Sequence, residues 1–196
     1  MYLYGASGHA KVIVDILQSN GKQITGMIDD NPAINELVGY PVYHELENPT
    51  PVIVSIGDNR IRRKVVEKLQ DAEFETAVHT SAIVSPQSEI GEGTVVMQGA
   101  IIQSGVVVEK HCIINTGVSV DHDCKIADFV HISPHATLCG NVRVGEGTWI
   151  GAGTTVIQGV TIGKWCVVGA GSVVTKDIPD NVLAVGNRCK VIKTYK

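Results

Sequence analysis

Residues 118–138 read VSVDHDCKIADFVHISPHATL, and an aliphatic side chain returns at every sixth position of this run. The same spacing continues in both directions without an insertion, from Val84 to Val174. The full series is Val84, Ile90, Val96, Ile102, Val108, Ile114, Val120, Ile126, Ile132, Leu138, Val144, Ile150, Val156, Ile162, Val168 and Val174. Four places after most of these residues stands a small or β-branched residue. A β-strand repeats every two residues and an α-helix every 3.6 or so, so neither explains a period of six.

A period of six predicts a parallel β-helix. Each hexapeptide forms one short strand and one turn, and its aliphatic residue points into a triangular prism. Three hexapeptides complete one coil of about 18 residues, and coils stack about 4.8 Å apart. Glycines in the turns suit the tight corners. The alternative is another all-β fold, such as a sandwich.

The chain before residue 80 follows a different pattern. Strands are expected at residues 2–4, 23–28 and 51–56, and helices at residues 10–18 and 61–69. This alternation predicts a small, Rossmann-like parallel α/β unit with roughly three strands. A short strand near residues 76–78 leads into the repeat. We therefore expect an α/β domain at 1–78, a β-helix domain at 79–182 and a basic C-terminal tail at 183–196.

Composition narrows the class of protein. The formal net charge of −4 at pH 7 argues against a nucleic-acid or anionic-membrane partner. No apolar run approaches the roughly 20 residues that a membrane span requires, and no signal peptide is recognisable. The five cysteines are odd in number and lack CxxC spacing, which indicates reduced thiols. We expect a cytoplasmic protein without membrane insertion.

A glycine-rich turn joins the first expected strand to the first expected helix. Such a turn offers backbone N–H groups to a phosphate, and an acid at the end of the second strand suits a ribose hydroxyl. The residues that fit are Gly5, Ser7, Gly8, His9, Asp29 and Asp30. Because the GxGxxG pattern is incomplete, a nucleoside diphosphate fits better than a whole dinucleotide. The alternative is a turn that only reverses the chain.

Four histidines lie within the repeat, at His111, His122, His131 and His135. His122 is flanked by Asp121 and Asp123, so a carboxylate can orient its ring and support an imidazolium. His131 follows nine residues later, which is one and a half hexapeptides. The two rings therefore occupy different faces and can meet only around a corner or across a subunit boundary.

These motifs together resemble a known family. The segment NTGVSVDHDC at residues 115–124, the later His131 and the Gly-Asn-Val at 140–142 are similar to bacterial sugar O- and N-acetyltransferases of the left-handed β-helix class. The opening YGASGH at residues 4–9, the Asp29-Asp30 pair and the segment IGDN at residues 56–59 resemble the same family's sugar-nucleotide domain. UDP-N-acetylbacillosamine-type N-acetyltransferases and sialic acid O-acetyltransferases share these motifs.

The resemblance implies roles for individual residues. His122 would be the general base, oriented by Asp123, although Asp121 could share that role. The residues implied in acetyl-CoA binding are Asn115, His131, Gly140, Ala152 and Ala170, with Arg188 and Lys190 for the 3′-phosphate. The residues implied in substrate binding are Ser7, Gly8, His9, Asp29, Asp30 and Gly57. The family is trimeric, with active sites between adjacent β-helices.

The function predicted on this basis is acetyl transfer from acetyl-CoA to a nucleotide-linked aminosugar. The acceptor would be of the UDP-4-amino-4,6-dideoxy-N-acetylglucosamine type, with direct attack on the thioester and no metal. One alternative is a sialic acid or other sugar O-acetyltransferase. A β-helical zinc carbonic anhydrase, with His122, His131 and His135 as ligands, is a second. A sugar-nucleotide-binding scaffold without catalysis is a third.

Overall fold

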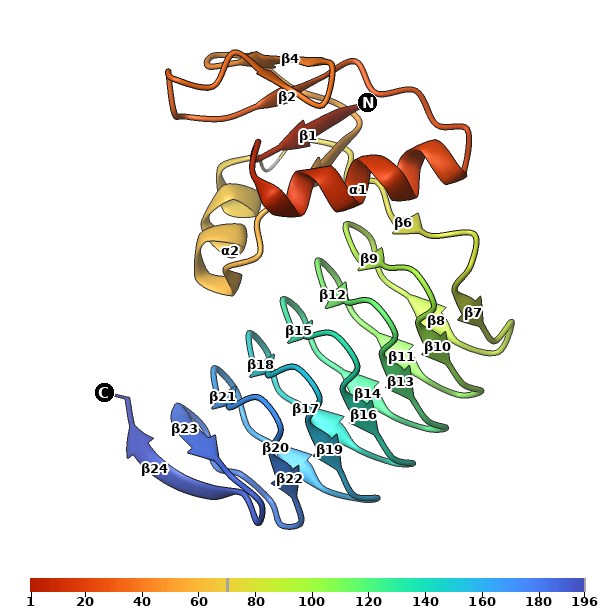
Figure 1. Cartoon of the computed structure of the whole chain (residues 1–196), viewed down its shortest axis with the longest axis vertical. Helices are drawn as coiled ribbons and strands as arrows, with labels where there is room; N and C mark the ends of the chain where they lie inside the picture. The colour runs from red at the N-terminus through yellow and green to blue at the C-terminus, as the bar shows by residue number, and fades with distance from the viewer. Residues whose placement is uncertain (70, 196) are drawn as a thin grey trace.

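The computed structural model describes residues 1–69 and 71–195. A triangular parallel β-helix forms the body of the molecule, and a small α/β unit lies at its N-terminal end (Figure 1). The predicted fold class is therefore confirmed.

Three sheets, parallel except for the last strand of the third, form the faces of the prism, here called faces I, II and III. Face I contains β7 (Ile83–Val84), β10 (Ile101–Ile102), β13 (Ser119–Val120), β16 (Thr137–Leu138), β19 (Thr155–Val156) and β22 (Val173–Val174). Face II contains β8 (Glu89–Ile90), β11 (Val107–Val108), β14 (Lys125–Ile126), β17 (Arg143–Val144) and β20 (Thr161–Ile162). Face III contains β6 (Ala77–Val78), β9 (Val95–Val96), β12 (Ile113–Ile114), β15 (His131–Ile132), β18 (Trp149–Ile150), β21 (Val167–Val168), β23 (Val182–Val185) and β24 (Lys190–Thr194).

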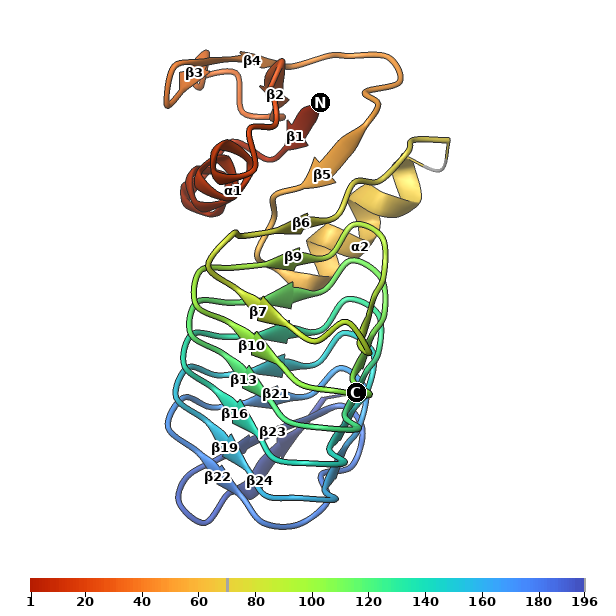
Figure 2. The same ribbon diagram turned by 90° about the vertical axis from the view of Figure 1, so that its right-hand side faces the viewer.

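The register between coils follows from the repeat. On face I, Ile101 pairs with Ser119, which pairs with Thr137, so each strand stacks on the one three hexapeptides earlier (Figure 2). The turns between faces form three edges: the I–II edge, the II–III edge and the III–I edge. A residue three hexapeptides along the chain therefore returns to the same place on the same edge.

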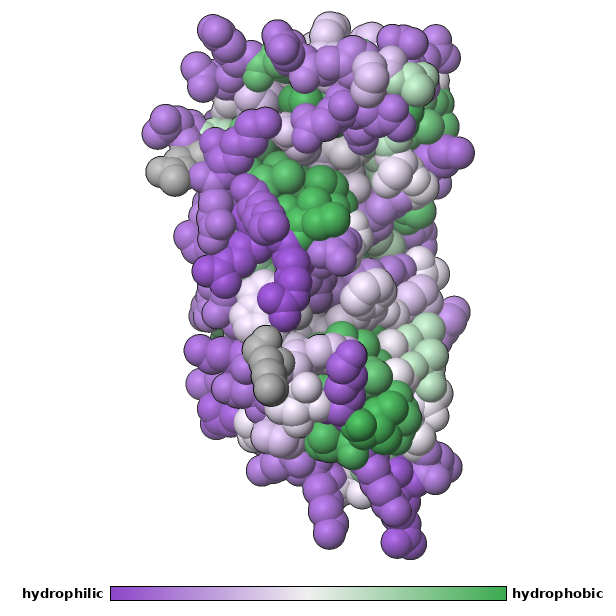
Figure 3. Space-filling model, turned by 90° about the vertical axis from the view of Figure 1, so that its left-hand side faces the viewer, coloured by the Kyte–Doolittle hydropathy of each residue, from purple (hydrophilic) through white to green (hydrophobic). Residues whose placement is uncertain are grey.

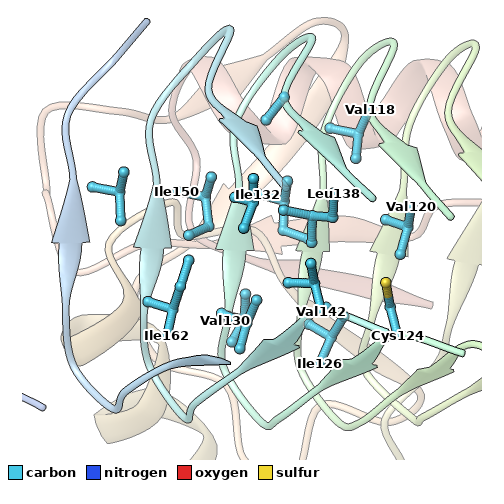
Figure 4. Close-up of a cluster of buried hydrophobic side chains, with 14 of the residues drawn as sticks. Val118, Val120, Cys124, Ile126, Val130, Ile132, Leu138, Val142, Ile150 and Ile162 are labelled. Atoms are coloured by element: carbon cyan, nitrogen blue, oxygen red, sulfur yellow. The ribbon is translucent and has the colours of Figure 1, made fainter. Parts of the chain in front are cut away.

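The aliphatic series fills the prism, as its spacing predicts. All of its members are buried except Val84 and Ile90, which are half-buried. Those two lie on the first strands of faces I and II, where no further coil covers them. Figure 4 shows inward-pointing side chains such as Ile126, Ile132 and Leu138 stacked along the axis. Full burial of a side chain of this size contributes about 1.5–3 kcal/mol.

The N-terminal unit contains a five-stranded sheet. Its elements are β1 (Tyr2–Tyr4), α1 (Gly8–Ser19), β2 (Gly26–Ile28), β3 (Glu36–Leu37), β4 (Tyr40–Tyr43), β5 (Val52–Val54) and α2 (Asn59–Lys68), and the strand order is β3-β4-β2-β1-β5. The expectation of roughly three strands was wrong because the β3–β4 hairpin was missed. Its turn residues, Val38 and Gly39, both have positive φ. A hairpin turn of that kind usually carries Asn-Gly, and Pro41 inside β4 also hides the strand.

Helix α1 packs the N-terminal unit against face III (Figure 1). Ala10, Ile13 and Leu17 of the helix share one buried cluster with Val95 and Ile113 of the β-helix. Outward-facing positions on the first coils of face III are thus covered. Further along that face, Trp149 of β18 and Val167 of β21 line surface pockets.

The face that carries α2 is mainly hydrophilic, with two separate hydrophobic areas (Figure 3). Exposed apolar side chains of the chain include Ile61 on α2 and Ile192 on β24. The segment expected as a basic tail contains β24, which pairs antiparallel with β23. Across residues 1–69 and 71–195, no helix has the length and hydropathy needed to cross a membrane.

Candidate active site

His122 and Asp123 form a hydrogen-bonded pair on the I–II edge, in the turn between β13 and β14. Asp123 Oδ2 lies 2.8 Å from His122 Nδ1, and Asp121 Oδ1 accepts a 2.9 Å hydrogen bond from the backbone N–H of His122. Of the two carboxylates that the sequence left open, Asp123 is therefore the one that contacts the ring. The hydrogen bond to Asp123, and then the charge of Asp121, raises the pKa of His122 above its ordinary value.

Two glycines from neighbouring coils make room for this pair. A Cβ atom on Gly140 would lie 2.6 Å from both Cε1 and Nε2 of His122. A Cβ atom on Gly105 would lie 2.6 Å from Asp123 Oδ1, and Gly105 has a φ of +72° that favours glycine. The imidazole thus lies against bare backbone on one side and the carboxylate on the other. Gly105 was not anticipated from the sequence, because its role depends on the register between coils.

His131 lies in a contrasting environment on β15. Its Nε2 atom is 3.1 Å from Asn115 Nδ2, and its Nδ1 atom is 3.3 Å from the carbonyl oxygen of Gly57. Trp149 from the next coil stacks on the ring, with centroids 5.1 Å apart and planes 11° from parallel. Burial, and then the positive charge of Arg62, lowers the pKa of His131 to about 3. His131 is therefore neutral at physiological pH.

A pocket of about 450 Å³, called the edge pocket below, opens beside His131 at the III–I edge. Its wall includes four residues that the sequence assigned to acetyl-CoA, namely Asn115, His131, Ala152 and Ala170. The structure therefore brings together residues that lie far apart in the sequence.

The remaining residues predicted to bind acetyl-CoA lie elsewhere. Gly140 is on the I–II edge under His122. Arg188 lies between β23 and β24, and Lys190 begins β24; both are exposed. His122 itself is on the I–II edge, whereas the edge pocket is on the III–I edge. Within one chain, the imidazole of His122 and the edge pocket therefore lie on different edges of the prism.

The residues predicted to hold a nucleotide gather at the carboxyl ends of three parallel strands. Ser7, Gly8 and His9 follow β1, Asp29 and Asp30 follow β2, and Gly57 follows β5. Open sheets of this kind bind ligands at that edge. These residues therefore lie close to one another at one edge of the sheet.

Some of these side chains already have hydrogen-bond partners in the part of the chain that the structure describes, and others do not. The Asp29 carboxylate accepts hydrogen bonds from the backbone N–H groups of Ala6, at 2.7 Å, and Asn31, at 2.9 Å. Asp29 therefore fixes the glycine-rich turn. Burial, and then the charge of Arg62, lowers the pKa of His9 to about 4. Its Nε2 atom is buried and has no protein partner within the described residues.

Helix α2 clamps the N-terminal unit to the II–III edge through a buried guanidinium. Arg62 Nε donates to the carbonyl oxygen of His111 at 2.9 Å, and Nη2 donates to that of Phe129 at 2.8 Å. Asn59 Nδ2 donates to the carbonyl oxygen of Gly147 at 3.0 Å. Helix α2 therefore donates hydrogen bonds to carbonyl groups at the same place on three successive coils, those of His111, Phe129 and Gly147. Burial lowers the pKa of Arg62 to about 10, so its charge is retained at neutral pH.

The importance of Arg62 could have been read from its spacing. Arg62 falls in the helical stripe with Val65, Val66 and Leu69, whereas Ile61 is exposed. An arginine inside an apolar stripe must find several acceptors when it is buried. A helix was predicted at residues 61–69, but no role was predicted for Arg62.

The geometry of the described residues does not support the zinc-binding alternative. Residues 1–69 and 71–195 contain no cluster of three or more His, Cys, Asp or Glu side chains suited to a metal ion. Both ring nitrogens of His131 are already engaged by Asn115 and Gly57. The three histidines of the carbonic anhydrase alternative therefore form no ligand set in the described chain.

Comparison with known proteins agrees with this architecture. Residues 1–69 match the family model of the PglD N-terminal domain, and residues 141–176 match that of the bacterial transferase hexapeptide (six repeats). PerB from Caulobacter crescentus, solved with CoA and GDP-perosamine, is 39% identical over 98% of this chain and 96% of that chain, with a TM-score of 0.92. The acetyltransferase domain of PglB from Neisseria gonorrhoeae FA1090, solved with acetyl coenzyme A, is 36% identical over 97% and 98%, with a TM-score of 0.90.

Curated relatives from Staphylococcus aureus are 50% identical over 66 residues, and the matched region spans 33% of their length. The repeat, the His–Asp turn and the edge pocket define a hexapeptide-repeat acyltransferase. The chain belongs to the left-handed β-helix family of CoA-dependent sugar N-acetyltransferases.

Proposed function

We propose that this chain transfers the acetyl group of acetyl-CoA to the amino group of a nucleotide-linked aminosugar. The observation that carries the proposal is the His122–Asp123 pair. Nδ1 of His122 is held by the carboxylate, and the exposed ring keeps Nε2 available to a substrate. The proposal is supported by PerB, which was solved with CoA and GDP-perosamine.

In the proposed mechanism, the amine attacks the carbonyl carbon of the thioester directly. His122 Nε2 takes a proton from the amine as the new C–N bond forms, and Asp123 stabilises the resulting imidazolium. The tetrahedral adduct then expels the CoA thiolate, which receives the proton from His122. The products are an N-acetylated sugar nucleotide and free CoA thiol, and no acyl-enzyme forms.

We further propose that the acetyl donor occupies the edge pocket and that the protein acts as a homotrimer. His122 and the edge pocket lie on different edges of one prism, so a single chain does not bring the base to the donor. A neighbouring chain related by three-fold symmetry can supply the missing half. In this arrangement, each active site combines His122 from one chain with Asn115 and His131 from the next.

The acceptor is proposed to carry a UDP-4-amino-4,6-dideoxy-N-acetylglucosamine-type sugar. The carboxyl ends of β1, β2 and β5 would hold its nucleotide through Ser7, Gly8 and His9, with Asp29, Asp30 and Gly57 alongside. PerB was solved with a GDP-linked sugar, so the nucleotide is the part of the proposal to test first.

The test is an acetyl-transfer assay with UDP-, GDP- and dTDP-linked aminosugars, followed by mass spectrometry of the product. We expect an N-acetylated sugar nucleotide and one free CoA thiol per turnover. Preference for the UDP-linked acceptor supports the finer proposal, and preference for another carrier contradicts that part alone. Failure to acetylate any aminosugar would contradict the proposed function.

A further inference from the structure

A series of hydrogen bonds leads from the N-terminal unit into the edge pocket. The carbonyl oxygen of Gly57 lies 3.3 Å from His131 Nδ1, and His131 Nε2 lies 3.1 Å from Asn115 Nδ2. Asn115 Oδ1 then accepts a 2.8 Å hydrogen bond from the backbone N–H of Thr116. Both His131 and Asn115 line the pocket.

The chemistry of these partners determines which atom donates and which accepts in each hydrogen bond of the series. A carbonyl oxygen can only accept, so Nδ1 of His131 carries the proton. Nε2 of the neutral ring is then an acceptor, and its partner must be an N–H of the Asn115 amide. The amide orientation is independently fixed at its other end, where Oδ1 faces the N–H of Thr116.

This arrangement leaves one donor unused. The Asn115 Nδ2 group has two N–H bonds, and His131 takes one. The described residues offer no hydrogen-bond partner for the other, although Asn115 is half-buried in the wall of the edge pocket. Both ring nitrogens of His131 are engaged by the protein, so the ring itself has no donor or acceptor left for a ligand.

We propose that His131 is a positioning residue, which fixes the Asn115 amide so that its remaining N–H donates to the carbonyl oxygen of the acetyl thioester. This inference rests on the proposed function. As the amine attacks, that oxygen gains negative charge, and a donor already held in place stabilises it. One such donor is worth about 10²–10³ in turnover.

Arg62 holds the Gly57 carbonyl group and also favours the neutral state of His131. Arg62 Nη1 donates to the carbonyl oxygens of Ile56, at 3.0 Å, and Gly57, at 3.2 Å, which holds the Gly57 carbonyl in place. The positive charge of Arg62 disfavours a second proton on the His131 ring, whereas His9, whose own pKa is lowered to about 4, is uncharged at neutral pH. Burial, together with the charge that the N-terminal unit brings through Arg62, therefore keeps His131 neutral in the wall of the edge pocket.

The first test needs no substrate. Long-range ¹H–¹⁵N spectra of ¹⁵N-histidine-labelled protein report which ring nitrogen carries a proton, and His131→Gln assigns the signal. We expect Nδ1 of His131 to be protonated and Nε2 unprotonated, without titration between about pH 5.5 and 8.5. A proton on Nε2, or titration within that range, would overturn the inference whatever the substrate is.

The second test compares two substitutions of His131. A glutamine can accept from Asn115 and donate to Gly57, but it cannot titrate; a leucine can do neither. We expect His131→Gln to keep kcat within about tenfold of the wild type, with the same pH profile, and His131→Leu to lose about 10²-fold. If His131→Gln is as slow as His131→Leu, or loses the acidic limb of the profile, His131 does more than position Asn115.

Asn115 supplies the third measurement. Asn115→Ala should lower kcat by about 10²–10³, with KM for acetyl-CoA changed by no more than about threefold. Wild-type kcat would contradict the inference, as would a loss confined to KM. Turnover by the wild-type protein in the same assay tests the proposed function separately. If the wild type acetylates nothing, the proposed function fails, and the NMR result still decides the tautomer.

Discussion

The turn that holds His122 and the strand that holds His131 place the same side chain in opposite environments. His122 is exposed and its ring meets a carboxylate, so its pKa is raised. His131 is buried and faces a carbonyl group and a nearby guanidinium, so its pKa is lowered to about 3. His122 lies in the turn between β13 and β14, and His131 begins β15, so both belong to the same β-helix. The partners of each ring therefore decide its protonation, and with it the chemistry each residue can perform.

This difference assigns separate tasks to the two regions. The His122 turn can accept and return a proton, because a carboxylate stabilises the charged ring. The edge pocket can only offer fixed dipoles and apolar surface to a ligand. Substitutions in one region should therefore change proton transfer, and those in the other should change the alignment of the donor.

The largest effect should come from removing the proposed base. His122→Ala should reduce kcat by about 10²–10⁴, within the usual range for one general acid–base group. Because the side chain is exposed, the melting temperature should hardly change. Steady-state kinetics and thermal melting of the same preparation check both expectations. Turnover close to that of the wild type would remove His122 from the mechanism.

The Arg62 clamp on the II–III edge should be the next most sensitive. Arg62→Met leaves the carbonyl groups of His111 and Phe129 without their donor, which should cost about 2–4 kcal/mol of unfolding free energy. Arg63→Gln is the matched control on the same helix, because Arg63 makes exposed salt bridges that contribute little. Denaturant unfolding of both variants measures the two unfolding free energies, and only that of Arg62→Met should fall. Equal stability of the two would show that the clamp is not structural.

Gly140 provides a way to disturb the His122 turn without touching its charges. In Gly140→Ala the new methyl group would meet the movable imidazole, so kcat should fall by about 10–100-fold, with little loss of stability. Gly145→Ala is the contrast, because there the Cβ atom would lie 2.6 Å from backbone. That variant should lose stability. If Gly140→Ala lowered the melting temperature and Gly145→Ala lowered only turnover, the close packing of the His122 ring on Gly140 would be contradicted.

The smallest and most diagnostic effect is on the pH profile. The base works when unprotonated, so turnover falls as the pH drops through the raised pKa of His122. Asp123→Asn removes the main cause of that shift. The acidic limb of kcat/KM should therefore move to lower pH. If the acidic limb stays in place or moves to higher pH, the titration of His122 does not cause it.

The sequence specified the β-helix well because each coil repeats one simple requirement. An aliphatic residue at every sixth place points inward from each strand when three hexapeptides form one coil. The His122–Asp123 pair could also be anticipated, since its partners are adjacent in the chain. Arg62, Gly105 and Trp149 could not be placed in the same way, because their contacts depend on register between coils or on how α2 meets the β-helix. The β3–β4 hairpin was missed because Val38-Gly39 is an unusual turn sequence.

The central claim is that the base and the donor pocket come from neighbouring chains. Coexpression of His122→Ala and Asn115→Ala chains with different affinity tags, followed by purification through both tags, isolates mixed trimers. In each of them one interface unites an intact His122 with an intact Asn115, so about one third of wild-type turnover should return. If the mixed protein is as inactive as either variant alone, the active site is not shared between chains.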